Sequence, residues 1–515
     1  MKNSHASHPK VLQPVALPSG LIMSNGLVKV AMYEHMASLF GGLPNAHHLA
    51  LYNLWSQGGW GMIITGNVQV SRDHLTLGKD MVVPETITSN TLHSYKALAR
   101  AMRPVSEQNL SKNQGDVSMP RTLIIMQVSH AGRQSPIVLG GRFPFVPPLA
   151  PSALGLGRSA SGWFARLTYK IGFPTPRIMS LQDIDSVVNR FMLSATLAHD
   201  AGFDGIELHA SHGYLLAQFI SPKSNVRDDA YSANHAPLYL LQRIVTSIRA
   251  VLPRPFVLGV KLNSSDYVGA GSVHDPRAEE EAEDRAVAHV VDVARWDMVD
   301  FIEVSGGDYE NPSFLPSSRQ AFFARFARKA RSAIHALTSP SRHPLVILTG
   351  GMQSPTIFQD ALAQGHADLV GVGRGSVLAP DLPLLLREFY ARRQSGAPDG
   401  DGDENMGRFF LFKQPTLSYA ETPLIRVAAS VLRSLGILPL PSLIGAGTTM
   451  AWYVVAMGSI SKGGKVNYRM GGIRAVVQIW LPELQTLAIL FCCCVACYAS
   501  FYMWSHFGND SFLST

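Results

Sequence analysis

Thr122-Leu-Ile-Ile-Met-Gln-Val128 is a short, largely apolar run in which apolar and polar positions do not alternate. A strand that faces solvent on one side alternates, whereas a strand covered on both faces is apolar almost throughout. The run therefore predicts a strand that is buried on both faces. Such strands are typical of a parallel sheet whose faces are covered by helices.

Runs of this kind recur at intervals that leave room for a helix between them. In chain order, the eight expected strands are 27–32, 61–66, 122–128, 203–209, 256–262, 299–304, 344–349 and 367–372. Apolar residues fall at helical spacing between them, as at Val187, Val188, Phe191 and Ala195. Eight strand–helix units predict an α/β fold, the (β/α)8 TIM barrel, and an open doubly wound sheet is the alternative.

The composition sets the broad class of protein. Of the 515 residues, 46% are hydrophobic and 16% are charged, so the chain can bury a large core. The formal net charge of +7 is spread along the chain, which argues against nucleic-acid binding and suits a phosphorylated cofactor. All four cysteines lie within 492–497, and the first 20 residues lack the apolar core of a signal peptide. We therefore expect a cytoplasmic catalytic body without disulfides.

The expected domains follow from shifts in composition. Residues 1–393 form the barrel, 394–407 are a linker rich in Gly, Asp and Pro, and 408–475 form a mostly helical C-terminal extension. The extension could pack on the barrel or on a second subunit of a homo-oligomer. Residues 476–515 form an apolar tail, in which 484–504 carry no charge and are long enough to cross a bilayer. A tail anchor and a buried helix at an oligomer interface both remain open.

In a TIM barrel the active site lies at the carboxyl ends of the strands. Polar residues and glycines gather at these ends, in the segments Gln127-Val-Ser-His130-Ala-Gly-Arg133-Gln, His209-Ala-Ser-His212-Gly-Tyr214, Lys261-Leu-Asn263, Glu303-Val-Ser305-Gly306-Gly307-Asp-Tyr309, Gly350-Gly351 and Gly373-Arg374. The loops after the seventh and eighth strands commonly hold a phosphate, for which glycine N–H groups and Arg374 are suited. The alternative is that these glycines only form tight turns.

The fourth and fifth strand ends carry the groups with reaction chemistry. His209 and His212 can donate hydrogen bonds to an oxygen on which negative charge develops, and Tyr214 can deliver a proton. A metal pair is disfavoured because no third ligand is evident, and packing roles in the core remain open for His209, His212 and Tyr214. Lys261 ends a buried strand and needs an anionic partner to keep its charge.

The series of motifs from about residue 24 to residue 393 resembles the Old Yellow Enzyme family, in its NADH:flavin oxidoreductase branch. The resemblance implies FMN as cofactor and NAD(P)H as reductant. It also implies an α,β-unsaturated carbonyl compound as substrate, held by His209 and His212 and protonated by Tyr214. The residues that it assigns to FMN are Ala31, Met32, Gly66, Gln127, Lys261, Gly350, Gly351, Gly373 and Arg374.

The chain departs from this family at two places. Ala31-Met32-Tyr33 stands where many relatives have Pro, an apolar residue and Thr or Cys, so a bulky side chain lies where a small one tunes the flavin. Tyr231-Ser-Ala-Asn234 replaces a Tyr-Gly-Gly sequence after the Asn225-x-Arg227-x-Asp motif. Two other functions remain open, a flavin-assisted isomerase without net reduction and a non-catalytic accessory protein on the same barrel. Consumption of NAD(P)H separates the first of these from a reductase.

Overall fold

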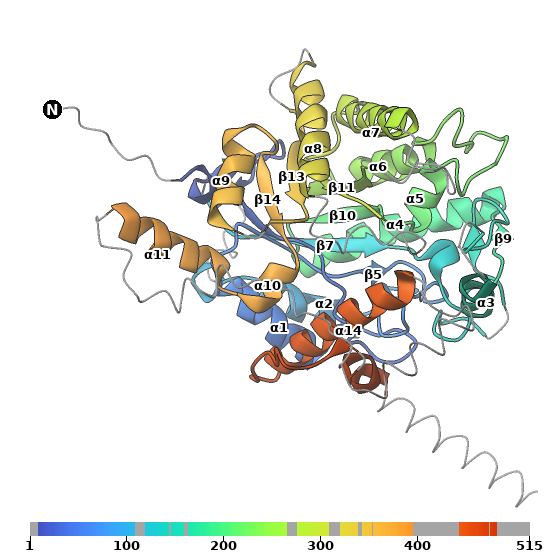
Figure 1. Cartoon of the computed structure of the whole chain (residues 1–515), viewed down its shortest axis with the longest axis horizontal. Helices are drawn as coiled ribbons and strands as arrows, with labels where there is room; N and C mark the ends of the chain where they lie inside the picture. The colour runs from blue at the N-terminus through green and yellow to red at the C-terminus, as the bar shows by residue number, and fades with distance from the viewer. Residues whose placement is uncertain are drawn as a thin grey trace, which may run out of the picture.

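The computed structural model describes residues 9–108, 119–143, 146–158, 163–264, 276–307, 309, 320–337, 342–352, 354–394, 442–472 and 474–480. Eight parallel strands close into a ring, which confirms the predicted (β/α)8 barrel (Figure 1). The ring runs through β3 (Leu27–Lys29), β4 (Met62–Ile64), β7 (Leu123–Ser129), β10 (Gly205–Ala210), β11 (Val257–Asn263), β12 (Phe301–Ser305), β13 (Leu345–Thr349) and β14 (Leu369–Val372), which pairs with β3 again.

Helices follow the strands in turn and cover the outside of the ring. They are α1 (Ala46–Ser56), α2 (Ser89–Ala101), α4 (Leu181–Ala201), α6 (Tyr239–Val251), α7 (Pro276–Arg295), α8 (Gln320–His335), α9 (Pro355–Ala363) and α11 (Leu382–Gln394). Local sequence fixes several of their ends. The hydroxyl of Ser180 accepts a hydrogen bond from the N–H of Asp183 at the start of α4, and Gly202 ends this helix with a φ of 89°.

Shorter strands and helices lie in the loops of the barrel and before its first strand. They are β1 (Val15–Ala16), β2 (Ile22–Met23), β5 (Val68–Gln69), β6 (Met81–Val82), β8 (Leu149–Ala150), β9 (Arg177–Ile178), α3 (Trp163–Gly172), α5 (Leu215–Ile220), α10 (Arg374–Leu378) and three single 3-10 turns at Lys10–Leu12, Val105–Glu107 and Gly132–Gln134. The antiparallel pair β1 and β2 contributes Leu17, Leu21 and Met23 to the same apolar cluster as the residues inside the barrel. The barrel interior is therefore packed with apolar side chains, and polar groups collect at the carboxyl ends of the strands.

The C-terminal extension contains a further helix, α14 (Ser442–Ile460), which packs on α10 and α1 of the same chain (Figure 1). Trp452 and Met457 of α14 are fully buried and belong to the apolar layer between strands and helices. The indole N–H of Trp452 donates to the carbonyl oxygen of Met470 at 3.0 Å, which ties α14 to the segment that follows it. The described part of the predicted extension thus packs on its own barrel.

The structure bears on only part of the membrane prediction. Among the described residues, no helix is long and apolar enough to cross a membrane. The segment 484–504, the linker residues 395–407 and the first part of the extension, 408–441, lie outside the described residues.

Candidate active site

A cavity of about 260 Å³ opens at the carboxyl ends of the strands. Eleven of the twelve residues predicted for the site line it, namely Ala31, Met32, Gln127, His209, His212, Tyr214, Lys261, Gly350, Gly351, Gly373 and Arg374. Gly66, the twelfth predicted residue, does not line the cavity. It lies behind the wall, where its N–H donates to the carboxylate of Glu34 at 3.0 Å and to the hydroxyl of Tyr52 at 2.7 Å.

The floor of the cavity is a row of charged and polar side chains on neighbouring strands. The parallel register places Gln127 beside Glu207, and Lys261 between His209 and Glu303. The ammonium of Lys261 lies 2.8 Å from Oε1 of Glu303, and both side chains are almost fully buried. Glu303 is therefore the anionic partner that a buried lysine requires, and Thr349 donates a further hydrogen bond to the same oxygen at 3.0 Å.

Glu207 is the second carboxyl group of this floor. Burial raises its pKa well above the usual value of 4.5, and the neighbouring charge of Glu303 raises it further. The amide of Gln127 donates to Oε2 of Glu207, whereas Oε1 of Glu207 and Oε2 of Glu303 have no partner among the described residues. A proton on Glu207 leaves Glu303 as the single negative charge that balances Lys261.

Two residues in the left-handed conformation turn the chain sharply after β10. His212 has a φ of 57° and Gly213 a φ of 73°, and the turn is closed by a bond of 3.2 Å from the N–H of Tyr214 to the carbonyl of Ser211. The turn brings three side chains that are up to five positions apart to one wall of the cavity. The ring of His209 lies 5.0 Å from that of His212 and 4.7 Å from that of Tyr214.

Both histidines are neutral at neutral pH. Burial lowers each pKa well below 6.5, and the charge of Lys261 adds to this shift. Nδ1 of His209 accepts a hydrogen bond of 3.3 Å from the N–H of Ser211, which places the ring proton on Nε2. Nε2 of His212 is engaged with the hydroxyl of Ser305 at 2.7 Å. The two histidines are thus held differently, a distinction that their sequence pattern does not predict.

Tyr214 is held by its hydroxyl as well as by the turn. Burial raises its pKa to about 12, while a hydrogen bond with Tyr309 opposes the shift. The two hydroxyl oxygens are 3.5 Å apart, and the amide of Asn67 donates to Tyr214 at 3.4 Å. Tyr214 therefore carries its proton at neutral pH and can act as a proton donor.

Gln134 connects the two loops that carry these groups. Its amide N–H donates to the carbonyl of His212 at 2.8 Å, and its carbonyl oxygen accepts from the N–H of Tyr309 at 3.1 Å. The hydroxyl of Tyr169 donates to the carbonyl of Tyr309 at 2.8 Å. These contacts fix the position of Tyr309. The sequence placed this residue near a strand end but assigned it no role, because its partners lie more than a hundred residues away along the chain.

Tyr33, the bulky residue after Ala31 and Met32, lines the cavity. Its hydroxyl donates to Asp80 at 3.3 Å and lies 3.1 Å from Nδ1 of His35. Asp80 is buried and also accepts from the amide of Gln69 and from the N–H and hydroxyl of Thr76. This cluster holds the phenol by its outer end, so the bulk of Tyr33 is fixed in place.

The other end of the cavity is built from glycines and a cation. Gly350 and Gly351 have φ values of 104° and 67°, at which any other residue is strained. Next to them, the segment from Gly373 leads into α10 with Arg374 as its first residue. Burial lowers the pKa of Arg374, and its interaction with Tyr453 of α14 opposes that shift. Thr449, Met450 and Tyr453 of α14 line this end.

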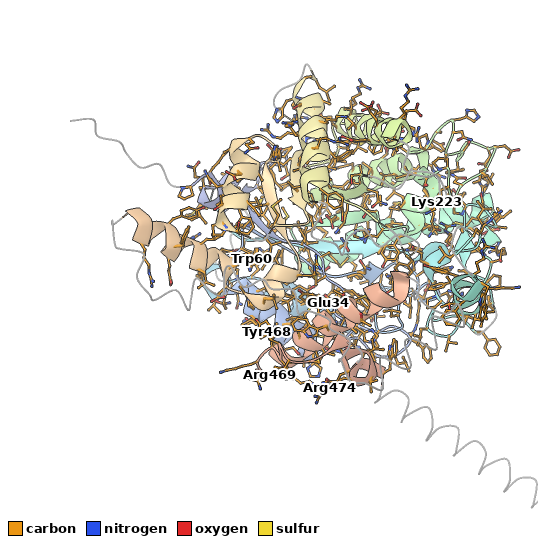
Figure 2. The ribbon with its side chains drawn as sticks, viewed as in Figure 1. Glu34, Trp60, Lys223, Tyr468, Arg469 and Arg474 are labelled. Atoms are coloured by element: carbon orange, nitrogen blue, oxygen red, sulfur yellow. The ribbon has the colours of Figure 1, made fainter. Side chains whose placement is uncertain are left out.

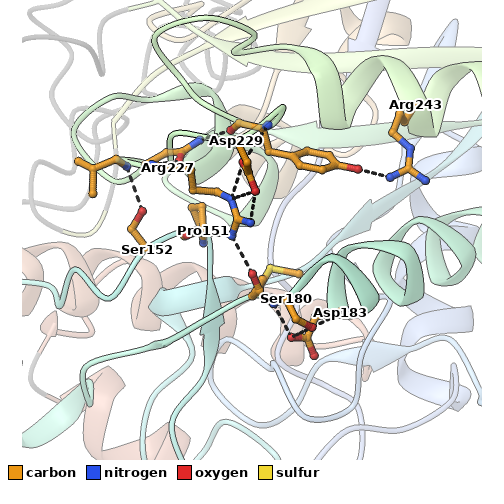
Figure 3. Close-up of polar contacts among 11 residues, drawn as sticks. Pro151, Ser152, Ser180, Asp183, Arg227, Asp229 and Arg243 are labelled. Carbon is orange, nitrogen blue, oxygen red and sulfur yellow. Dashed lines mark hydrogen bonds and ion pairs between the residues drawn. The ribbon is translucent and has the colours of Figure 1, made fainter.

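The Asn225-x-Arg227-x-Asp motif lies outside the cavity and locks the loop that follows α5 (Figure 3). Arg227 donates to the carbonyl oxygens of Met179 at 2.7 Å and Pro151 at 3.3 Å, and it forms an ion pair with Asp229. The amide of Asn225 donates to the carbonyls at both ends of the loop, at 2.7 Å each. The motif therefore positions α5, the helix that begins directly after Tyr214.

The barrel carries a cation beside a glycine-lined loop, and a row of buried proton donors stands in the same cavity. This combination defines a barrel enzyme that binds a phosphorylated cofactor beside its substrate. The sequence model of the NADH:flavin oxidoreductase / NADH oxidase family matches residues 10–389. The chain belongs to this family, which includes Old Yellow Enzyme.

Named relatives agree with this assignment. The chain is 37% identical over 406 residues to the NADH-dependent flavin oxidoreductase iliE of Neonectria sp. (strain DH2), covering 76% of this chain and 49% of that protein. It is 35% identical over 389 residues to the NADH-dependent flavin oxidoreductase iccE of Talaromyces variabilis, covering 72% of this chain and 85% of that protein. The chain thus spans about half the length of the Neonectria relative.

Solved structures share the fold. An Old Yellow Enzyme homologue from Zymomonas mobilis superimposes with a TM-score of 0.54 at 20% identity, covering 76% of this chain and 94% of that one. Morphinone reductase gives a TM-score of 0.54 at 19% identity, covering 75% and 91%.

The cavity fits FMN, the cofactor that the family implies. At one end, Gly350 and Gly351 present a backbone that no side chain obstructs, next to Arg374. Gly373 lines the cavity, and a Cβ added there would lie in van der Waals contact with the sulfur of Met32, at 3.4 Å. At the other end Lys261 offers a buried cation. Among the described residues, no group of three or more His, Cys, Asp or Glu side chains could hold a metal ion.

Proposed function

We propose that this chain is an FMN-dependent oxidoreductase that uses NADH or NADPH to reduce the activated C=C bond of an α,β-unsaturated carbonyl compound. The observation that carries the proposal is one wall of the cavity, on which a neutral histidine with its proton on Nε2 lies next to a protonated tyrosine. Bound FMN would supply hydride transfer in both directions, from the nicotinamide and to the substrate.

The residues of this chain have distinct roles in the proposal. The Nε2–H of His209 donates to the carbonyl oxygen, where negative charge increases as the β carbon gains hydride. His212 supports the same oxygen once its bond to Ser305 rearranges, because Nε2 is engaged in the structure. Tyr214 donates its proton to the α carbon. Ala31, Met32, Gln127 and Lys261 line the flavin, and Gly350, Gly351, Gly373 and Arg374 hold its phosphate.

Lys261 forms a buried ion pair with Glu303 and lines the cavity, where a bound flavin that gains negative charge on reduction would find a cation. The buried pair provides this charge without exposing an ammonium group to solvent. Gly66 acts indirectly in this scheme, since its N–H holds Glu34 and Tyr52 behind Met32.

The test is an absorbance experiment on the full-length protein reconstituted with FMN under anaerobic conditions. NADH or NADPH should bleach the flavin band, and 2-cyclohexenone should restore it with formation of cyclohexanone. His209→Ala should slow the restoration by about 10²- to 10³-fold and leave the bleaching unchanged. A flavin band that neither nucleotide bleaches would favour the isomerase, in which no net reduction occurs. A protein that binds no FMN would overturn both and favour the accessory protein.

A further inference from the structure

The part of the chain that follows the barrel also contributes to the cavity. The family model ends at residue 389, whereas α14 spans Ser442–Ile460. Figure 1 shows α14 beside α10 and α1, at the mouth of the barrel, and direct contacts with both helices agree with this view. Thr449, Met450 and Tyr453 lie on the face of α14 that meets the cavity. The neighbouring Trp452 is fully buried and anchors the helix.

The strand order shows which end of the cavity α14 closes. Around the ring, β14 stands four places from β10 in either direction, so the two strands face each other across the barrel. The histidines and Tyr214 follow β10, and α10 with Arg374 follows β14. Since α14 packs on α10, it borders the glycine-lined end and lies away from the wall that carries His209.

Tyr453, like Thr449, is a polar side chain of α14 that lines this end of the cavity. The residue is only 3% exposed, and its hydroxyl makes no hydrogen bond with the described residues. A largely buried phenol that lines a cavity and makes no hydrogen bond within the protein is available to a ligand in that cavity. Tyr453 and Arg374 line the same cavity, and the charge of Arg374 lowers the pKa of Tyr453 against the rise that burial causes.

We propose that Tyr453 is an FMN-binding residue supplied by the C-terminal extension, and that its hydroxyl donates a hydrogen bond to the phosphate held by Arg374, Gly350 and Gly351. A phosphate is the acceptor that both a phenol and a guanidinium would share at a glycine-lined loop. The proposal rests on the proposed function only in requiring that the chain binds FMN. The C-terminal extension then completes the cofactor site from within one chain.

Riboflavin provides the decisive comparison because it lacks the phosphate and keeps the ring system. Flavin-free full-length protein is titrated with FMN and with riboflavin, and binding is followed by quenching of flavin fluorescence. Tyr453→Phe should weaken FMN binding by about 10- to 100-fold, as expected for a hydrogen bond to a charged group, and should change riboflavin binding by less than about twofold. The melting temperature of the flavin-free variant checks that the fold is kept.

Tyr468→Phe is the matched control. Tyr468 (labelled in Figure 2) lies on the same extension, is 55% exposed, has its ring tilted at 46° to that of Trp452, and does not line the cavity. The Tyr468→Phe variant should bind FMN with the same affinity as the unmodified protein. The proposal is overturned if Tyr453→Phe binds FMN normally, or if it weakens FMN and riboflavin equally, because the hydroxyl then does not meet the phosphate. Failure of the unmodified protein to bind FMN would instead overturn the proposed function.

Discussion

Replacing Glu303 by glutamine tests how the charges under the cavity are balanced. The ammonium of Lys261 lies 2.8 Å from Glu303, with 4% and 0% of the two side chains exposed. Removing one partner of such a buried pair commonly costs about 3–5 kcal/mol, because the other charge is left without compensation. Here the cost should fall below that range. The pKa of Glu207 is raised first by burial and next by the charge of Glu303, so loss of that charge allows Glu207 to ionise beside Lys261.

The pair of carboxyl groups therefore predicts a strongly non-additive set of variants. Glu207→Gln alone should cost less than about 1 kcal/mol, because it replaces a neutral carboxyl group by a neutral amide of similar shape. The double variant, with glutamine at 207 and 303, should show the full cost of about 3–5 kcal/mol, since Lys261 then has neither carboxylate. The coupling between the two sites should reach about 1–3 kcal/mol.

Urea unfolding of the flavin-free protein, followed by tryptophan fluorescence, measures these differences. Trp55 and Trp60 are fully buried and report on the core (Figure 2 labels Trp60). The pH dependence gives an independent check. The folded protein keeps the proton of Glu207 above 4.5, the pKa at which the unfolded chain loses it. Stability should therefore fall with rising pH, relative to Glu207→Gln, by up to about 1.4 kcal/mol per pH unit.

Two results would refute this reasoning. Additive costs of the two single variants would mean that Glu207 does not take over the role of Glu303. Parallel stability curves for the unmodified protein and Glu207→Gln between about pH 5 and pH 7 would mean that Glu207 is already ionised in the folded protein.

Three further predictions concern the wall of the cavity and its support. Tyr214→Phe should slow the return of flavin absorbance with enone by about 10²- to 10⁴-fold and leave bleaching by NADH unchanged, as measured by stopped-flow absorbance. Because the pKa of Tyr214 is about 12, the rate of that return in the unmodified protein should be constant between about pH 6 and pH 9, and a fall there would assign the proton to another group. Tyr309→Phe removes the partner 3.5 Å from the Tyr214 hydroxyl and should slow the same step by at most about tenfold. Arg227→Met leaves the carbonyl oxygens of Met179 and Pro151 without their donor and should lower the free energy of unfolding by about 1–3 kcal/mol, whereas Arg243→Met, at a more exposed ion pair, should cost less than about 1 kcal/mol.

The barrel could be predicted from the sequence because strands buried on both faces leave a plain signal. Residues 122–128 coincide closely with β7, since every residue of that strand is covered by the apolar interior or by helices. β3 is shorter than the run 27–32, because Val30, Ala31 and Met32 leave the ring and line the cavity. β4 is shorter than the run 61–66, whose last residue, Gly66, lies behind the cavity wall. Apolar pattern reports burial, and it does not distinguish a paired strand from a buried loop.

The site could be predicted only in part. The rule that strands point their carboxyl ends toward the active site placed the residues of the fourth to eighth strands in one cavity. The partners of these residues could not be predicted from the sequence. The ion pair of Glu303 with Lys261 depends on strand register, and the hydrogen bond of Gln134 with Tyr309 depends on loop packing. Gly66 was expected at the flavin and lies behind Met32, since its N–H is used by Glu34.

The distribution of charge along the cavity suggests how one site serves both cofactor and substrate. The cations at the cavity lie at its two ends, with Lys261 neutralised by Glu303 and Arg374 beside the glycines. On the strand next to Lys261 and in the turn that follows it, burial keeps His209, His212 and Tyr214 uncharged at neutral pH. An anionic cofactor that spans the cavity would therefore find charge only where it carries charge itself. A neutral carbonyl compound would meet neutral donors, which bind a neutral oxygen weakly and an oxygen that gains negative charge strongly, and that difference is what accelerates a reaction.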